Sequence, residues 1–192
     1  MEFLLLGLLV FLGTHSVRIV AEGWRSQKVQ AWGAERWKGL FSLASALGLA
    51  LTVWGYGQAR LHPVLVWLPP VGLRHLASLL TMVAFVLLAA AYVPGNLIKT
   101  RLRHPMILGV KVWALAHLLA NGMLAQMVLF GTFLLWSVLD YPAARQRDRQ
   151  SLAPAPAGTA GATGITVAVG VAAWVAFVFW LHGWLMGVRP MG

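Results

Sequence analysis

The stretch from Arg101 to Asn121, RLRHPMILGVKVWALAHLLAN, holds the side chains of this sequence that are best suited to chemistry. It begins with basic residues and a His-Pro pair that includes His104, and continues as an apolar run that contains Lys111 and His117. A charged or titratable side chain within hydrocarbon is costly, so it normally faces a partner, a cofactor or a water-filled cavity. The stretch therefore predicts a functional site on a membrane helix.

Three side chains of this run share one helix face, because Trp113, His117 and Asn121 recur at every fourth position. A packing seam with a hydrogen-bonded histidine is the structural alternative. If Lys111 extends its amine to the membrane surface, His117 lies roughly 9 Å deeper at about 1.5 Å per residue. His15, a few residues before a basic loop, is expected at a comparable depth.

The chain has six histidines: His15, His62, His75, His104, His117 and His182. All except His62, which lies in the loop between the second and third apolar runs, lie in or at the ends of apolar runs. A neutral imidazole is a frequent ligand of haem iron and also binds zinc and copper. A haem held by two histidines needs an apolar slot, small residues that admit the ring, and cations near the propionates. Glycines, ten tryptophans and nearby basic residues supply these parts.

Several kinds of chemistry are excluded by what the sequence lacks. With no cysteine, the chain has no thiolate ligand, no disulfide and no CxxCH motif for covalent haem attachment. It has no HExxH zinc motif, and its five acidic residues lie near span ends or in loops. No serine triad can be assembled without an acid inside the membrane.

The composition is that of a small multi-pass membrane protein. Hydrophobic residues make up 59% of the chain and charged residues only 10%, against about 25% charged in a soluble domain. The net charge of +10 comes from basic residues between apolar runs, which indicates anionic lipid and topology rather than nucleic acid. The N-terminal run has no basic start and no cleavage pattern, so it is expected to remain as the first membrane helix.

We predict an all-α integral membrane protein, a helical bundle with six transmembrane helices. The apolar runs cover approximately residues 3–17 (extended to 20), 40–56, 73–93, 106–120, 123–139 and 165–188. Asn121-Gly122 indicates a turn between the fourth and fifth runs. One long tilted helix through that region would give five spans instead.

With six spans, the basic residues are distributed unequally between the two membrane faces. Eleven of the fifteen fall on one side, in the segments 18–38, 99–103 and 145–149. Cytoplasmic loops carry the excess of Lys and Arg, so both termini are expected in the periplasm. We predict a single transmembrane domain over 1–192, with a cytoplasmic linker at 140–164 that is basic and then rich in Pro, Ala and Gly.

Short motifs along the whole chain outside the linker resemble those of the NnrU family: His15-Ser16-x-Arg18, Trp37-Lys38-Gly39-Leu40, Trp54-Gly55-Tyr56-Gly57, Tyr92-Val93-Pro94-Gly95-Asn96, Arg103-His104-Pro105-Met106 and Leu181-His182-Gly183-Trp184. This resemblance implies a bacterial inner-membrane protein associated with denitrification and nitric oxide reductase function. The implied partners are membrane lipid and a nitric oxide or nitrite reductase system.

The chain is also similar to the cis-zeta-carotene isomerase family of plants and cyanobacteria, membrane proteins that use haem b. The matching residues are His15-Ser16, the Arg-His-Pro motif and Trp113-Ala114-Leu115-Ala116-His117. The resemblance implies that His15 and His117 are the axial iron ligands, with His75 and His104 as further functional histidines. Ala114 replaces an isomerase cysteine that exchanges with a histidine ligand, so ligand switching and isomerase activity are in doubt.

The leading hypothesis is therefore a membrane protein that binds haem b between His15 and His117, with a role in redox chemistry, gas sensing or nitric oxide metabolism. Trp113 and Asn121 accompany His117 on its helix face. The expected propionate contacts are the basic residues Arg18, Arg101, Arg103 and Lys111, because charge-assisted pairs compensate buried carboxylates. The alternatives are a haem-dependent isomerase of a polyene lipid, and a cofactor-free scaffold for a respiratory complex.

Overall fold

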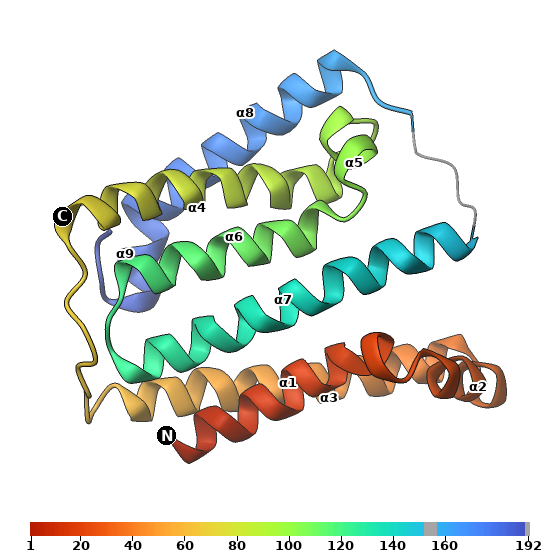
Figure 1. Ribbon diagram of the computed structural model, residues 1–192, viewed down its shortest axis with the longest axis horizontal. Coiled ribbons are helices and arrows are strands. Elements are labelled where there is room, and N and C mark those ends of the chain that lie inside the picture. The colour runs from red at the N-terminus through yellow and green to blue at the C-terminus, as the bar shows by residue number, and fades with distance from the viewer. Residues whose placement is uncertain (152–156, 191–192) are drawn as a thin grey trace. The chain divides into compact units, whose positions relative to one another are not determined.

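The structure is a computed structural model that describes residues 1–151 and 157–190. Its helices, drawn in Figure 1, are α1 (Glu2–Val20), α2 (Glu22–Trp32), α3 (Ala34–Ala59), α4 (Val71–Tyr92), α5 (Leu97–Leu102), α6 (Pro105–Ala120), α7 (Leu124–Ser151), α8 (Ala160–Ala176), the π-helix η1 (Phe177–Leu181) and α9 (His182–Met186). The predicted all-α membrane architecture is confirmed. Over the described residues, five helical segments, rather than the predicted six, are long and apolar enough to cross a membrane. The fourth predicted span, α6, is apolar but only 16 residues long.

The chain divides into two compact units. The first comprises Met1–Leu68 with Asn121–Ala143, and the second comprises Pro69–Ala120 with Ala144–Gly192. His15 belongs to the first unit, and His117 belongs to the second.

The first unit is built on the close approach of α1 and α3. On α3 the buried residues are all small, namely Gly48, Thr52, Gly55 and Ala59, at alternating spacings of four and three that keep them on one face. A Cβ atom added to Gly55 would overlap the backbone of Phe3 and Leu4 in α1. Small residues of this kind let membrane helices pack through their backbones.

This packing predicts a large effect of a bulky side chain at Gly55. Gly55→Val should lower the free energy of unfolding by about 2 kcal/mol or more, since overpacking a tight contact typically costs about 1–3 kcal/mol. Gly57, two residues along, has open space around its would-be Cβ, so Gly57→Val is the matched control. Thermal unfolding of the two variants in detergent should differ by several degrees, and equal midpoints would contradict the close contact.

The chain between α6 and α7 is held in a non-helical turn by hydrogen bonds to the loop at residues 64–67. The carbonyl of Gly122 accepts hydrogen bonds from the amides of Val66 (2.8 Å) and Trp67 (3.3 Å), and the amide of Leu124 donates to the carbonyl of Val64 (2.8 Å). A Cβ at Gly122 would overlap the carbonyl of Trp67. The predicted turn at Asn121-Gly122 is therefore present, and the single long helix through this region is not.

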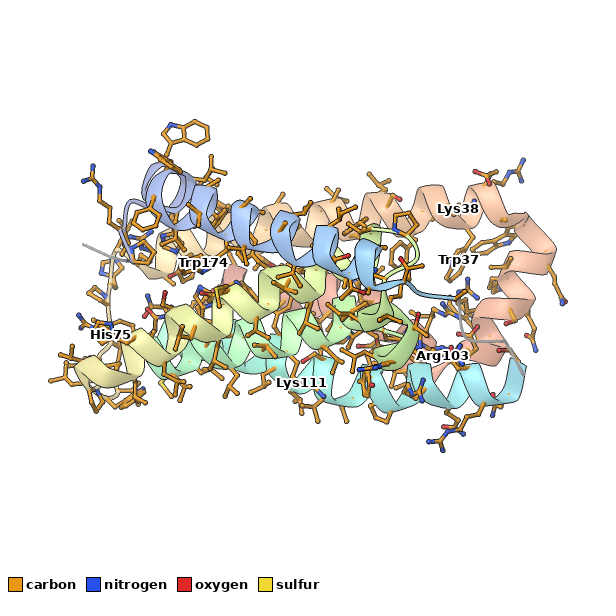
Figure 2. All side chains as sticks on the ribbon, turned by 90° about the horizontal axis from the view of Figure 1, so that it is seen from above. Trp37, Lys38, His75, Arg103, Lys111 and Trp174 are labelled. Carbon is orange, nitrogen blue, oxygen red and sulfur yellow. The ribbon has the colours of Figure 1, made fainter. Side chains whose placement is uncertain are left out.

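The second unit packs α4 against α6 and α8. Buried alanines of α4 and Gly109 of α6 bring these two helices together, and Gly170 of α8 lies against the backbone of Val86. The indole nitrogen of Trp174 donates to Thr81 at 3.1 Å, which ties α8 to α4; Figure 2 labels this tryptophan. After Ala176 the helix widens into the π-helix η1 before α9 begins at His182.

The helix boundaries differ from the predicted ones at two places. The basic segment 18–38 is not a loop, because it contains the polar helix α2. The predicted linker at 140–164 is largely helical, since α7 continues past Pro142 to Ser151 and α8 begins at Ala160. Alanine, arginine and glutamine favour helix, and the Arg145–Asp148 ion pair (3.6 Å) supports the extension. Residues 152–156 of that linker lie outside the described residues.

Candidate functional site

His15 lies on α1 in an aromatic environment within the first unit. Its Nδ1 is 2.7 Å from the carbonyl oxygen of Phe11, one turn earlier. The imidazole centroid is 4.3 Å from that of Phe11, 5.0 Å from that of Phe41 and 6.1 Å from that of Trp136. The ring is half-buried. His15 is therefore held in one orientation by its backbone hydrogen bond and by three aromatic rings.

An indole beside His15 carries an unused hydrogen-bond donor. Nε1 of Trp136 is buried and has no hydrogen-bond partner within the described part of the chain, although its ring stands edge-on to His15 at an interplanar angle of 89°. A buried polar group without a partner is uncommon and usually indicates an additional bound group or a water. The surroundings of His15 thus fit a ligand that supplies an acceptor.

His117 on α6 has the same local arrangement as His15. Its Nδ1 is 2.8 Å from the carbonyl oxygen of Trp113, also four residues earlier, and the two rings are 5.1 Å apart. A carbonyl oxygen only accepts hydrogen bonds, so Nδ1 carries the proton in both histidines. In the neutral ring, Nε2 then has the lone pair that binds a metal.

His104 is held by a carboxylate instead. Its Nε2 is 3.0 Å from Oδ2 of Asp148, and Arg145 contacts the same carboxylate oxygen at 3.6 Å. The preceding residue, Arg103, is the one non-glycine residue of the described chain with a positive φ, at 64°. Such a conformation is strained and is frequently found at functional sites. The Arg-His-Pro motif therefore has an unusual backbone, and its histidine contacts the Asp148 carboxylate near the end of α7.

The remaining predicted site residues lie on several different helices. His75 is exposed near the start of α4, and Arg101 is exposed on α5. Arg18 forms an ion pair with Glu22 at 3.1 Å. Lys111 and Asn121 are half-buried. Among the predicted site residues, Trp113 and His117 are in contact, as their hydrogen bond and ring distance show. Figure 2 labels His75, Arg103 and Lys111, which mark three separate places in the second unit.

Sequence reasoning counted His182 among the histidines at the ends of apolar runs but gave it no role in the site. His182 directly follows the π-helix η1. Its Nδ1 is 2.7 Å from the carbonyl of Val188, and its ring is 5.7 Å from that of Phe177. Short π-helical segments are enriched at functional sites. The motif Leu181-His182-Gly183-Trp184 was the available signal in the sequence.

A multi-ligand metal centre is not formed by the protein side chains that the structure describes. Over residues 1–151 and 157–190, no group of three or more His, Asp or Glu side chains is positioned to hold a metal ion. A haem requires fewer protein ligands, because the porphyrin itself supplies four nitrogens and the protein only the axial positions.

Comparison with known proteins gives a family for the whole chain. No curated protein and no solved structure matches the chain significantly. One family model, described as NnrU protein, matches residues 3–190 and so covers both compact units. The chain therefore belongs to the NnrU family.

Proposed function

We propose that this NnrU-family protein binds haem b in the bacterial inner membrane, with His15 and His117 as the axial ligands of the iron. The observation that carries the proposal is the matched hydrogen bonding of the two rings. Each Nδ1–H donates to the carbonyl four residues earlier, at 2.7 Å and 2.8 Å. A metal-binding histidine almost always donates its other ring N–H in this way, which fixes the tautomer and the ring orientation.

The environment of each ring supports the same proposal. Aromatic side chains surround His15, and Trp113 packs on His117. An apolar surround suits the porphyrin plane, and the indole Nε1–H of Trp136 is available to donate to a bound group. Ala114, at 0% exposure, leaves no side chain there that could exchange with a histidine ligand. These features favour a fixed pair of ligands over a switching site.

The basic residues are assigned to the haem carboxylates. Arg18 lies one turn after His15, while Arg101, Arg103 and Lys111 precede His117 along the chain. Charge-assisted hydrogen bonds from such groups would compensate propionates brought close to hydrocarbon. His75 and His104 are assigned to the surroundings of the cofactor or to a second site. These assignments rest on residue type and position along the helices.

The proposed physiological role is in nitric oxide metabolism during denitrification. A haem b held by these two histidines would supply one-electron transfer. The protein would fix the two imidazoles and exclude water around them. If the shorter apolar helix α6 also crosses the membrane, the chain has six spans. Both termini would then lie in the periplasm, because the segments 18–38, 99–103 and 145–149 hold most of the basic residues and are assigned to the cytoplasm.

Haem quantification of the purified chain tests the proposal. The protein is expressed with haem supplied, purified in detergent, and assayed for haem b against protein by the pyridine haemochrome spectrum. We expect a single haem per chain, as two axial histidines imply. A colourless protein that remains without haem under these conditions would refute the proposal and favour a cofactor-free scaffold.

A further inference from the structure

A cavity of about 330 Å³ opens where α1, α2 and α3 meet in the first unit. Its polar wall includes three basic side chains, Arg18, Arg25 and Lys38, together with the hydroxyl group of Ser42. Apolar and aromatic side chains, among them Phe41, form the rest of the wall. Figure 2 labels Lys38 and the neighbouring Trp37 at the first turns of α3. The cavity therefore has one cationic side and one apolar side.

Two carboxylates, Glu22 and Glu35, form ion pairs with the basic residues of this cavity. Glu22 is shared by two guanidinium groups, Arg18 and Arg25, each at 3.1 Å. Glu35 pairs with Lys38 at 2.8 Å, but both of these side chains are largely exposed. Exposed pairs of this kind are weak. The described residues that line the cavity include three basic side chains and no acidic one, so an anion that enters it would meet a positively charged wall.

The cavity lies beside α2, a helix whose composition is typical of the membrane–water interface. α2 contains no buried residue, although it connects two helices that are long and apolar enough to cross a membrane. Trp24 and Trp32 of α2 are exposed, and both rings pack on Trp37 at centroid distances of 5.7 Å and 6.5 Å. Tryptophan concentrates at the level of lipid head groups. Lys28 sits over the rings of Trp24 (5.9 Å) and Trp32 (5.1 Å), so basic and aromatic groups alternate along α2.

We propose that this cavity binds the head group of an anionic phospholipid, with the phosphate between Arg25 and Lys38. The glycerol and the first methylenes of the acyl chains would lie against Phe41 and the face of Trp37. Arg25 is already placed over the Trp37 ring, with 5.9 Å between Cζ and the ring centroid, so its guanidinium is positioned at the boundary between the polar and apolar walls. The combination of cations, a hydroxyl and an apolar wall matches a lipid phosphate better than a free anion.

Native mass spectrometry of the full-length protein in detergent tests this site. Dioleoylphosphatidylglycerol and dioleoylphosphatidylcholine are titrated separately, and the apparent dissociation constant of the first bound lipid is measured. We expect a preference for phosphatidylglycerol. The double variant R25Q/K38Q should weaken phosphatidylglycerol binding by about 25-fold, because each basic group near an anionic head group contributes about fivefold. Phosphatidylcholine binding should change little.

Matched variants separate the cavity from general charge attraction. K28Q/R36Q removes the same charge from the same segment at residues that do not line the cavity, and it should change the dissociation constant less than twofold. Ser42→Phe fills the cavity without altering charge and should also weaken phosphatidylglycerol binding. Equal losses in the two double variants, or no lipid preference in the wild type, would overturn the proposal. Displacement of the lipid by millimolar inorganic phosphate would instead indicate a free-anion site and would also contradict it.

The test is independent of the haem proposal. R25Q/K38Q should retain the haem content of the wild type, since neither residue is assigned to the cofactor. Loss of haem in this variant together with unchanged lipid binding would reassign the cavity to the cofactor carboxylates and would overturn the lipid site. Size-exclusion profiles and helical circular dichroism confirm that each variant is folded.

Discussion

Replacing His117 with alanine is expected to abolish the low-spin haem spectrum of the purified protein. The imidazole of His117 has its Nδ1–H engaged by the Trp113 carbonyl at 2.8 Å, so Nε2 is the nitrogen proposed to bind iron. Alanine removes this ligand and leaves the rest of α6 a good helix former. The reduced protein should lose its split α-band and sharp Soret peak, with haem content lowered at least several-fold.

The control variants make this result specific. His15→Ala should produce the same loss as His117→Ala, because both axial positions are required for a low-spin iron. His62 is exposed in the loop after α3, and His62→Ala should leave the spectrum unchanged. External imidazole should partly restore the bands of His117→Gly. A low-spin spectrum that survives in His117→Ala would refute this ligand; loss in His182→Ala but not in His117→Ala would move the assignment to His182.

Replacing Asn96 with aspartate is expected to destabilise the second unit strongly. Asn96 is 1% exposed. Its side-chain amide donates to the carbonyls of Ala90 (3.0 Å) and Val93 (2.5 Å), and its Oδ1 accepts from the amide of Lys99 at 2.7 Å. Aspartate would place a carboxylate oxygen against two carbonyl oxygens. We expect a loss of about 3 kcal/mol or more in the free energy of unfolding.

Gln58→Glu provides the matched control for this substitution. It makes the same amide-to-acid change at an exposed position of α3, where the expected effect is within about 0.5 kcal/mol. Thermal unfolding in detergent, followed by circular dichroism, measures both variants. Similar midpoints for Asn96→Asp and Gln58→Glu would contradict the role of the Asn96 hydrogen bonds.

The apolar runs predicted where the apolar helices lie, but not that α6 is shorter than the other candidate spans. α1, α3, α4 and α6 cover the expected runs, and the glycine that ends the α6–α7 connection was visible as Asn121-Gly122. The polar helix α2 was not predicted, because it buries no residue and so has no apolar stripe to detect. The π-helix η1 was not predicted either, since its apolar sequence FVFWL has the same composition as the α-helix before it.

The candidate site was predictable by residue type and only partly by geometry. The sequence indicated which histidines lie within apolar runs, but the hydrogen bonds that select a tautomer appear only when Phe11 and Trp113 have taken up helical backbone. The partner of His104 could not be predicted, because Asp148 lies 44 residues further along the chain. His182 was not included among the site residues because the π-helix that precedes it could not be foreseen from its apolar sequence.

Electron paramagnetic resonance of the ferric protein at low temperature tests the central claim most directly, because the signal reports the axial ligands of the iron. For the wild type with haem bound, we predict a low-spin signal of a bis-histidine haem and no high-spin component. His15→Ala and His117→Ala should each retain at most a high-spin signal from residual haem. A high-spin wild-type signal, or a low-spin signal that persists in both variants, would contradict ligation of the iron by His15 and His117.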